Sequence, residues 1–140
     1  MGYNFNRYDT AKFEEGEWDE FEGGRFKVAR LGNPVYRDAM RRLEKEYRKR
    51  HGDELTAEQQ DRMHAEGLAE GVLRDWGDIE GLEDGKVVSV PYSIDAAADL
   101  LIRDPKLLHW VTRKATDLER FERDDLETQA KKPQKRSDTN

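Results

Sequence analysis

The residues best suited to chemistry by type and spacing lie in one acidic stretch, RDWGDIEGLEDGKVVSVPYS, at positions 74–93. Clustered carboxylates around a glycine turn could hold Ca²⁺, which binds several oxygen ligands. An EF-hand alignment that puts Gly85 at the sixth position places Leu82 at the third and Pro91 at the twelfth. Neither of those side chains carries an oxygen, so the stretch does not fit an EF-hand loop. We expect a structural turn here instead.

Other residue types that do chemistry are sparse. The chain has no cysteine, and none of its three histidines (His51, His64 and His109) has another histidine four residues away, the spacing of a helical zinc site. No serine stands in a Gly-x-Ser-x-Gly motif, and no glycine-rich loop precedes a Lys-Ser or Lys-Thr pair. The sequence therefore predicts no enzyme, no metal site and no cofactor.

Charge is distributed in blocks along the chain. The formal net charge is −6 and 40 % of the residues are charged. Residues 35–50 are rich in Lys and Arg, whereas residues 51–85 are strongly acidic. A basic helix could neutralise phosphates, but acids interrupt this one and the chain as a whole repels nucleic acid. We expect protein partners and no nucleic acid, and a small DNA-binding regulator that uses residues 35–50 is an alternative.

The two ends of the chain differ from its middle. No apolar run approaches the length that spans a membrane, and the first residues lack the apolar segment of a signal peptide. We therefore expect no membrane partner. The composition predicts a flexible acidic and aromatic arm at residues 1–22, a single helical domain at residues 23–125 and a disordered basic tail at residues 126–140.

Turn and capping residues predict the elements of the domain. Gly23-Gly24 between two short aromatic runs predicts a hairpin. Four helix starts follow, at Asn33-Pro34, Thr56, Ser93 and Asp104-Pro105. The first helix is expected to end near Arg50, the third near Ile102 and the last near Asp124. In the second helix an apolar stripe continues to Trp76, and Gly67 and Gly71 suggest a close approach between helices.

These elements define the expected fold class. It is mainly α with a minor α+β character: about four helices, a small N-terminal β-hairpin and one short additional strand at Val87–Val90.

Three large aromatic residues and three arginines are the candidates for partner binding. Trp76 and Trp110 could be core residues, but aromatics beside a charged turn also fit a protein interface. The candidate set is Trp76, Tyr92, Trp110, Arg37, Arg41 and Arg48.

A series of short motifs is ordered along residues 23–121. It contains GGRFKV, a Leu-Arg-Asp-Trp sequence, an acidic turn closing with Asp-Gly, then Val-Pro-Tyr-Ser and an Asp-Pro break. This order resembles the tail assembly chaperones of long-tailed bacteriophages. The acidic and aromatic residues 1–22 are a departure from that family's pattern.

The resemblance implies a non-enzymatic role in phage tail assembly. Such a chaperone binds the tape measure protein, keeps it soluble and helps to recruit the major tail protein, and it leaves before the tail is complete. The resemblance therefore implies a protein of the infected host's cytoplasm that is absent from the mature virion. A second copy of the chain is a further candidate partner. The alternative function is a virion structural protein, such as a tail terminator or a head–tail connector subunit.

Overall fold

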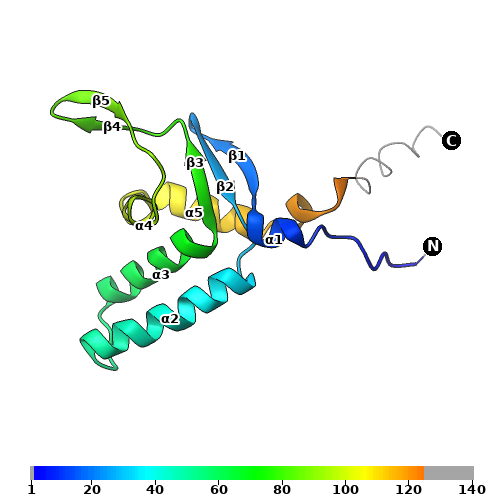
Figure 1. The fold of residues 1–140 in the computed structure, drawn as a ribbon, viewed down its shortest axis with the longest axis horizontal. Coiled ribbons are helices and arrows are strands. Elements are labelled where there is room, and N and C mark those ends of the chain that lie inside the picture. The colour runs from blue at the N-terminus through cyan, green and yellow to red at the C-terminus, as the bar shows by residue number, and fades with distance from the viewer. Residues whose placement is uncertain (1, 125–140) are drawn as a thin grey trace.

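Helices in pairs and strands in short runs follow one another after α1 in the computed structural model, which describes residues 2–124 (Figure 1). The helices are α1 (Ala11–Glu15), α2 (Pro34–His51), α3 (Ala57–Gly71), α4 (Ile94–Arg103) and α5 (Pro105–Ala115), followed by the 3₁₀ turn η1 (Leu118–Phe121). The strands are β1 (Glu17–Phe21), β2 (Gly24–Val28), β3 (Leu73–Gly77), β4 (Glu80–Glu83) and β5 (Lys86–Ser89). β1, β2 and β3 form an antiparallel sheet in that order, and β4 pairs with β5 in a separate antiparallel hairpin.

The expected fold class, a mainly α domain with one hairpin and one extra strand, is wrong. Within residues 2–124, five α-helices combine with two small antiparallel sheets, so the fold is mixed α+β. The difference comes from two strands, β3 and β4, that the sequence analysis does not predict. For each of these two strands there is a physical reason why the sequence does not predict it.

β3 escapes because its buried residues have the spacing of a helix. The apolar stripe expected to continue one helix to Trp76 is divided: α3 ends at Gly71, and Leu73 and Trp76 lie on β3. Trp76 pairs with Phe26 and Leu73 with Val28, so residues three apart on β3 face residues two apart on β2. The register shifts at this point, as in a β-bulge, and this irregularity gives a strand the i, i+3 pattern of a helix.

β4 escapes because nearly all of it is exposed and no apolar alternation marks it. Its four residues, Glu-Gly-Leu-Glu, have only the glycine partly buried. The hairpin turn is nevertheless visible in the sequence. Asp84 and Gly85 both have positive φ, 51° and 78°, which fits the two-residue type I′ turn favoured by Asp-Gly. The expected strand at Val87–Val90 exists, one residue earlier, as β5.

All four predicted helix starts are confirmed. Asn33 accepts a hydrogen bond from the Tyr36 amide at 3.0 Å, and Thr56 forms a capping box with Gln59. Ser93 and Asp104 cap α4 and α5 by accepting hydrogen bonds from backbone amides three residues ahead. The last helix is shorter than expected, because α5 ends at Ala115 and the chain then turns into η1.

The two glycines of α3 permit the close helix contact that the sequence predicts. A methyl group at Gly71 would overlap the backbone of Tyr36, and one at Gly67 would overlap the sulfur of Met40. α2 and α3 therefore lie close together at both positions. Asn33 joins the same contact, since its buried amide donates to the Gly71 carbonyl at 2.8 Å.

Much of the segment predicted as a flexible arm, residues 1–22, packs against the domain instead. β1 pairs with β2 along its whole length, and Tyr8 forms a β-bridge with Glu122. The Phe13 ring meets the Phe121 ring edge-on, with centroids 5.7 Å apart. The pairing of β1 with β2 confirms the hairpin predicted at Gly23-Gly24, whereas the packing of Phe13 against Phe121 is not visible in the acidic composition of the segment. The predicted basic tail, residues 126–140, lies outside the described residues.

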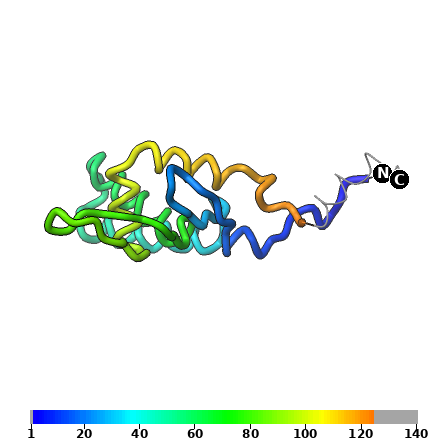
Figure 2. Tube along the Cα trace, turned by 90° about the horizontal axis from the view of Figure 1, so that it is seen from above, coloured from blue at the N-terminus to red at the C-terminus, as the bar shows by residue number. Residues whose placement is uncertain are grey.

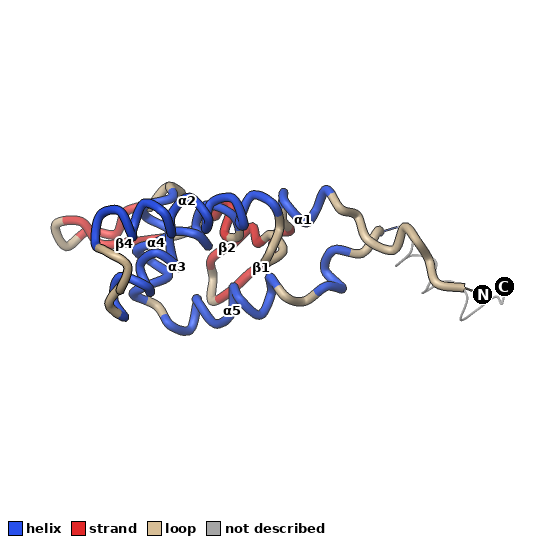
Figure 3. Tube along the Cα trace, turned by 90° about the horizontal axis from the view of Figure 1, so that it is seen from below, coloured by secondary structure: helices blue, strands red, loops and turns tan. Residues whose placement is uncertain are grey.

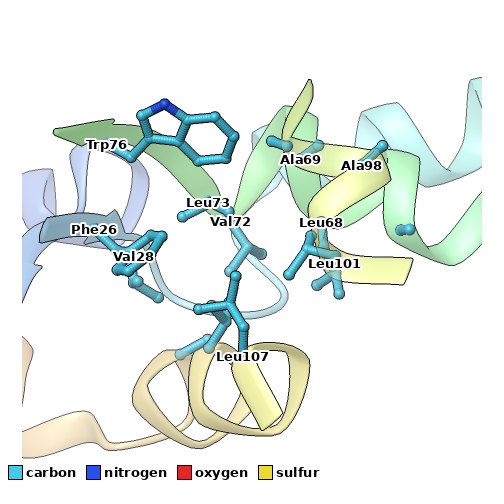
Figure 4. Close-up of a cluster of buried hydrophobic side chains, with 14 of the residues drawn as sticks. Phe26, Val28, Leu68, Ala69, Val72, Leu73, Trp76, Ala98, Leu101 and Leu107 are labelled. Atoms are coloured by element: carbon cyan, nitrogen blue, oxygen red, sulfur yellow. The ribbon is translucent and has the colours of Figure 1, made fainter. Parts of the chain in front are cut away.

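The core lies where the sheet meets the helices. Buried side chains from β2, β3, α3, α4 and α5 form one cluster (Figure 4), and α3 packs between α2 and α4. The β4–β5 hairpin stands away from this core. Figures 2 and 3 show it at one end of the long axis, with the first described residues at the other end.

Candidate protein-binding surface

The two candidate tryptophans are core residues. Trp76 is 7 % exposed and Trp110 is 5 % exposed. The indole N–H of Trp76 donates to the Val90 carbonyl at 2.9 Å, which satisfies its one polar group and ties β3 to the end of the β4–β5 hairpin. Trp110 stacks on Phe21, with ring centroids 5.0 Å apart. In this fold, both indoles stabilise the domain and neither presents a broad face to a partner.

Tyr92 has a similar structural role. Its ring meets the Trp76 ring edge-on at 5.4 Å, and its hydroxyl lies within hydrogen-bond distance of the Ala69 and Leu73 carbonyls, at 2.8 Å and 2.7 Å. Burial raises the pKa of this hydroxyl to about 12, because ionisation would place a charge where water is scarce. Tyr92 therefore joins the segment before α4 to the end of α3 and the start of β3.

The three candidate arginines lie on the exposed side of α2. Arg41 pairs with Asp38 at 3.0 Å, and Arg48 pairs with Glu44 at 3.8 Å. Both are pairs within one exposed helix, which contribute little to stability and leave the guanidinium groups accessible. The structure separates these arginines from the three aromatics, so the six candidates do not form one site.

Phe5 and Tyr3, near the start of the chain, are the most exposed large apolar residues, but within the helices and strands the most exposed are on the β4–β5 hairpin, which the candidate set omits. Leu82 is 77 % exposed and Val87 is 65 % exposed, and they are directly paired across the two strands. Directly opposed residues project from the same face of a hairpin. A two-stranded hairpin gains little stability from its own packing. The exposed apolar pair therefore contributes little to the fold and is available for contact with another molecule. The Asp-Gly turn flanked by Leu82 and Val87 is the signal that could have identified this pair.

A cleft opens between the β1–β2 turn, the β3–β4 connection and the junction of α4 with α5. We call it the acid-rimmed cleft, and its volume is about 570 Å³. Its apolar residues are Phe21, Phe26, Ile79, Leu100 and Leu107. Its charged residues are all carboxylates: Glu22, Asp78, Glu80 and Asp104. The cleft thus combines five apolar residues, which we call its floor, with four carboxylates at the edge, of which Glu22 and Asp78 pair with Lys106 and Arg25.

A second groove, of about 320 Å³, lies between the β4–β5 hairpin and α4. We call it the hairpin groove. It shares Ile79, Glu80 and Leu100 with the acid-rimmed cleft and adds Leu82 and Val90 at the hairpin side. The two depressions are therefore neighbours along α4. Together they form a longer concave surface that a segment of another protein could occupy.

Among residues 2–124, no three His, Asp or Glu side chains are grouped so that they could hold a metal ion. None of the helices in this part of the chain is long and apolar enough to cross a membrane.

Comparison with known proteins gives one family. Residues 31–132 match the family model described as YdaY prophage protein. No curated protein and no solved structure matches the chain significantly. The family match covers α2 to η1 and therefore includes both the hairpin and the concave surface. It confirms the phage origin that the sequence resemblance implies, and it does not name a tail assembly chaperone.

Proposed function

The chain belongs to the YdaY prophage protein family, and from this premise we propose that it is a phage tail assembly chaperone. In this role it binds the tape measure protein, keeps it soluble and helps to recruit the major tail protein. It acts without catalysis, in the cytoplasm of the infected host. A second copy of the chain is an additional candidate partner.

One observation carries the proposal: the exposed Leu82–Val87 pair stands beside a concave surface with an apolar floor. A chaperone of an aggregation-prone client needs apolar contacts that it can present without aggregating itself. Charged side chains around those contacts favour solubility, and this chain carries a formal net charge of −6. Phage origin and the order of the Trp-turn-Tyr-Ser motifs support the same role.

Co-expression with the tape measure protein of the same prophage tests the proposal. We expect the tape measure protein to be soluble with this chain and insoluble without it, and the two to copurify. The variant Leu82→Ser/Val87→Ser tests the surface itself, because it removes exposed apolar contacts and leaves the core intact. A tape measure protein whose solubility does not depend on the chain would refute the chaperone role.

Purified virions provide the test of localisation. We expect mass spectrometry to find the chain in the lysate of induced cells and not in purified particles. If the chain is a stoichiometric component of the virion, it is a structural protein such as a tail terminator or connector subunit, and the chaperone proposal is wrong.

A further inference from the structure

We propose that the acid-rimmed cleft and the hairpin groove form one binding site for a partner helix that carries Lys or Arg side chains beside an apolar face. Only the identification of the partner helix as part of the tape measure protein rests on the proposed function. The chemistry of the site is argued from this chain alone.

The shape of the site suits a helix. α4 forms one wall through Leu100, which lines both depressions, and the connection between β3 and β4 contributes Ile79 to both. A helix laid along this surface could place its apolar side chains in the cleft and the groove in turn, in the helix-in-groove mode of recognition. Leu82 lines the groove, and its cross-strand partner Val87 adds exposed apolar surface next to it.

Three of the five apolar residues of the floor are incompletely covered within the chain, whereas Phe26 and Leu107 are buried. Phe21, Ile79 and Leu100 pack against the core yet are only partly buried. Covering this remaining apolar surface on binding would remove it from water, which favours a complex. The site therefore offers apolar contact area for a partner as well as charge.

The charge of the rim selects a basic partner. Glu22 and Asp78 already attract cations of this chain, Lys106 at 3.4 Å and Arg25 at 3.3 Å, but these pairs are exposed and contribute little. Glu80 has no ion pair with any residue between 2 and 124. A partner's Lys or Arg side chains could pair with Glu80 and replace the weak internal pairs at the rim.

The hairpin groove is less acidic than the cleft. It contains one cation, Arg103, together with Glu80 and Asp99. Asp99 forms an ion pair with Arg62 at 2.7 Å. Glu80 is the carboxylate that lines both depressions. The cations of the partner helix are thus expected to meet the cleft, while its apolar face continues along the groove.

Binding of designed peptides tests the site directly. The probe is a labelled amphipathic peptide of about 18 residues, or about five turns, with leucine on one face and lysine on its flanks. Three control peptides replace lysine by glutamate, leucine by serine, or two central residues by proline to prevent the helix. Fluorescence anisotropy with the full chain should show binding of the lysine peptide, much weaker binding of each control, and loss of affinity at high salt.

Variants of the protein locate the peptide. Glu22→Gln/Glu80→Gln should lower the affinity for the lysine peptide by about fivefold, since each change removes one partly exposed charge pair. The control Glu46→Gln/Glu119→Gln makes the same charge change at exposed acids outside the site and should leave the affinity unchanged. Circular dichroism of each variant verifies that the fold is retained.

Several results would overturn the inference: no binding of the lysine peptide, equal binding of the glutamate or proline peptide, or an equal loss of affinity in both double variants. These outcomes are separable from failure of the proposed function. Peptide binding without any effect on tape measure solubility would refute the chaperone role and leave the site intact. Solubilisation of the tape measure protein without any binding of the lysine peptide would refute the site and leave the chaperone role intact.

Discussion

The aromatic core and the β4–β5 hairpin make opposite use of large apolar side chains. Trp76 and Trp110 bury almost all of their surface and Tyr92 is partly buried against Trp76, and the polar atoms of Trp76 and Tyr92 reach backbone carbonyls. On the hairpin, Leu82 and Val87 leave most of their surface in water. The two regions adjoin, since Trp76 is bonded to Val90 at the hairpin's end. The contrast indicates that the core positions the hairpin, and the hairpin is the region that we propose binds a partner.

Truncation of the core should have the largest effect on stability. Trp110→Ala removes an indole that stacks on Phe21 and meets Phe26 edge-on. Loss of a buried tryptophan leaves a cavity and is expected to lower the free energy of unfolding by about 3–5 kcal/mol. Urea unfolding followed by circular dichroism measures the change. A cost under about 1 kcal/mol would mean that Trp110 is not a core residue, because surface substitutions lie in that range.

A methyl group in the α2–α3 contact should have the next largest effect. Gly71→Ala would overlap the backbone of Tyr36, which cannot move aside as a side chain can. We expect a loss of about 1–3 kcal/mol from overpacking, which outweighs the gain of about 1 kcal/mol that alanine brings to a helix. Gly67→Ala is the matched control: its methyl group meets the flexible end of Met40, so its cost should be smaller. Equal thermal stability of both variants would contradict the close contact at Gly71.

Removal of the Tyr92 hydroxyl should have a smaller effect with a distinct pH dependence. Tyr92→Phe loses the hydrogen bonding to Ala69 and Leu73 and should cost about 1 kcal/mol near neutral pH. The pKa of Tyr92 is about 12 in the folded chain, above its ordinary value of 10.0. The stabilisation by the neutral phenol is thus complete below pH 10 and is lost as the pH rises toward 12. Comparing unfolding of both proteins across this range tests the assignment, and identical slopes would contradict it.

Changes on the hairpin should have the smallest effect on stability. Leu82→Ser/Val87→Ser alters exposed side chains outside the core, so we expect a change within about 0.5 kcal/mol. The same variant should bind the tape measure protein more weakly, which separates the hairpin's role from that of Trp110. A strongly destabilised double variant would mean that Leu82 and Val87 stabilise the fold, as Trp110 does.

Sequence reasoning succeeded where a residue's role is local. Asn33, Thr56, Ser93 and Asp104 each cap a helix within three residues of their own position, and such contacts are visible in the sequence. It failed where the role depends on a distant strand. The spacing of Leu73 and Trp76 looks helical until β2 and its irregular register are known.

The same distinction between local and long-range contacts applies to the candidate site. The aromatic candidates Trp76, Tyr92 and Trp110 are conspicuous by type, yet only the fold shows that both tryptophans are buried and that Tyr92 is partly buried against Trp76. The acid-rimmed cleft is built from residues between Phe21 and Leu107, far apart in the sequence, so no local motif could predict it. The Leu82–Val87 pair could have been predicted, because the Asp-Gly turn between two short runs indicates a hairpin.

Hydrogen–deuterium exchange of the full chain, alone and in complex with the tape measure protein, tests most directly whether partners bind at the hairpin and the adjoining concave surface. The account predicts new protection in residues 78–90 and at the β1–β2 turn, with little change along the exposed side of α2. Protection confined to α2, or the absence of any complex, would contradict it.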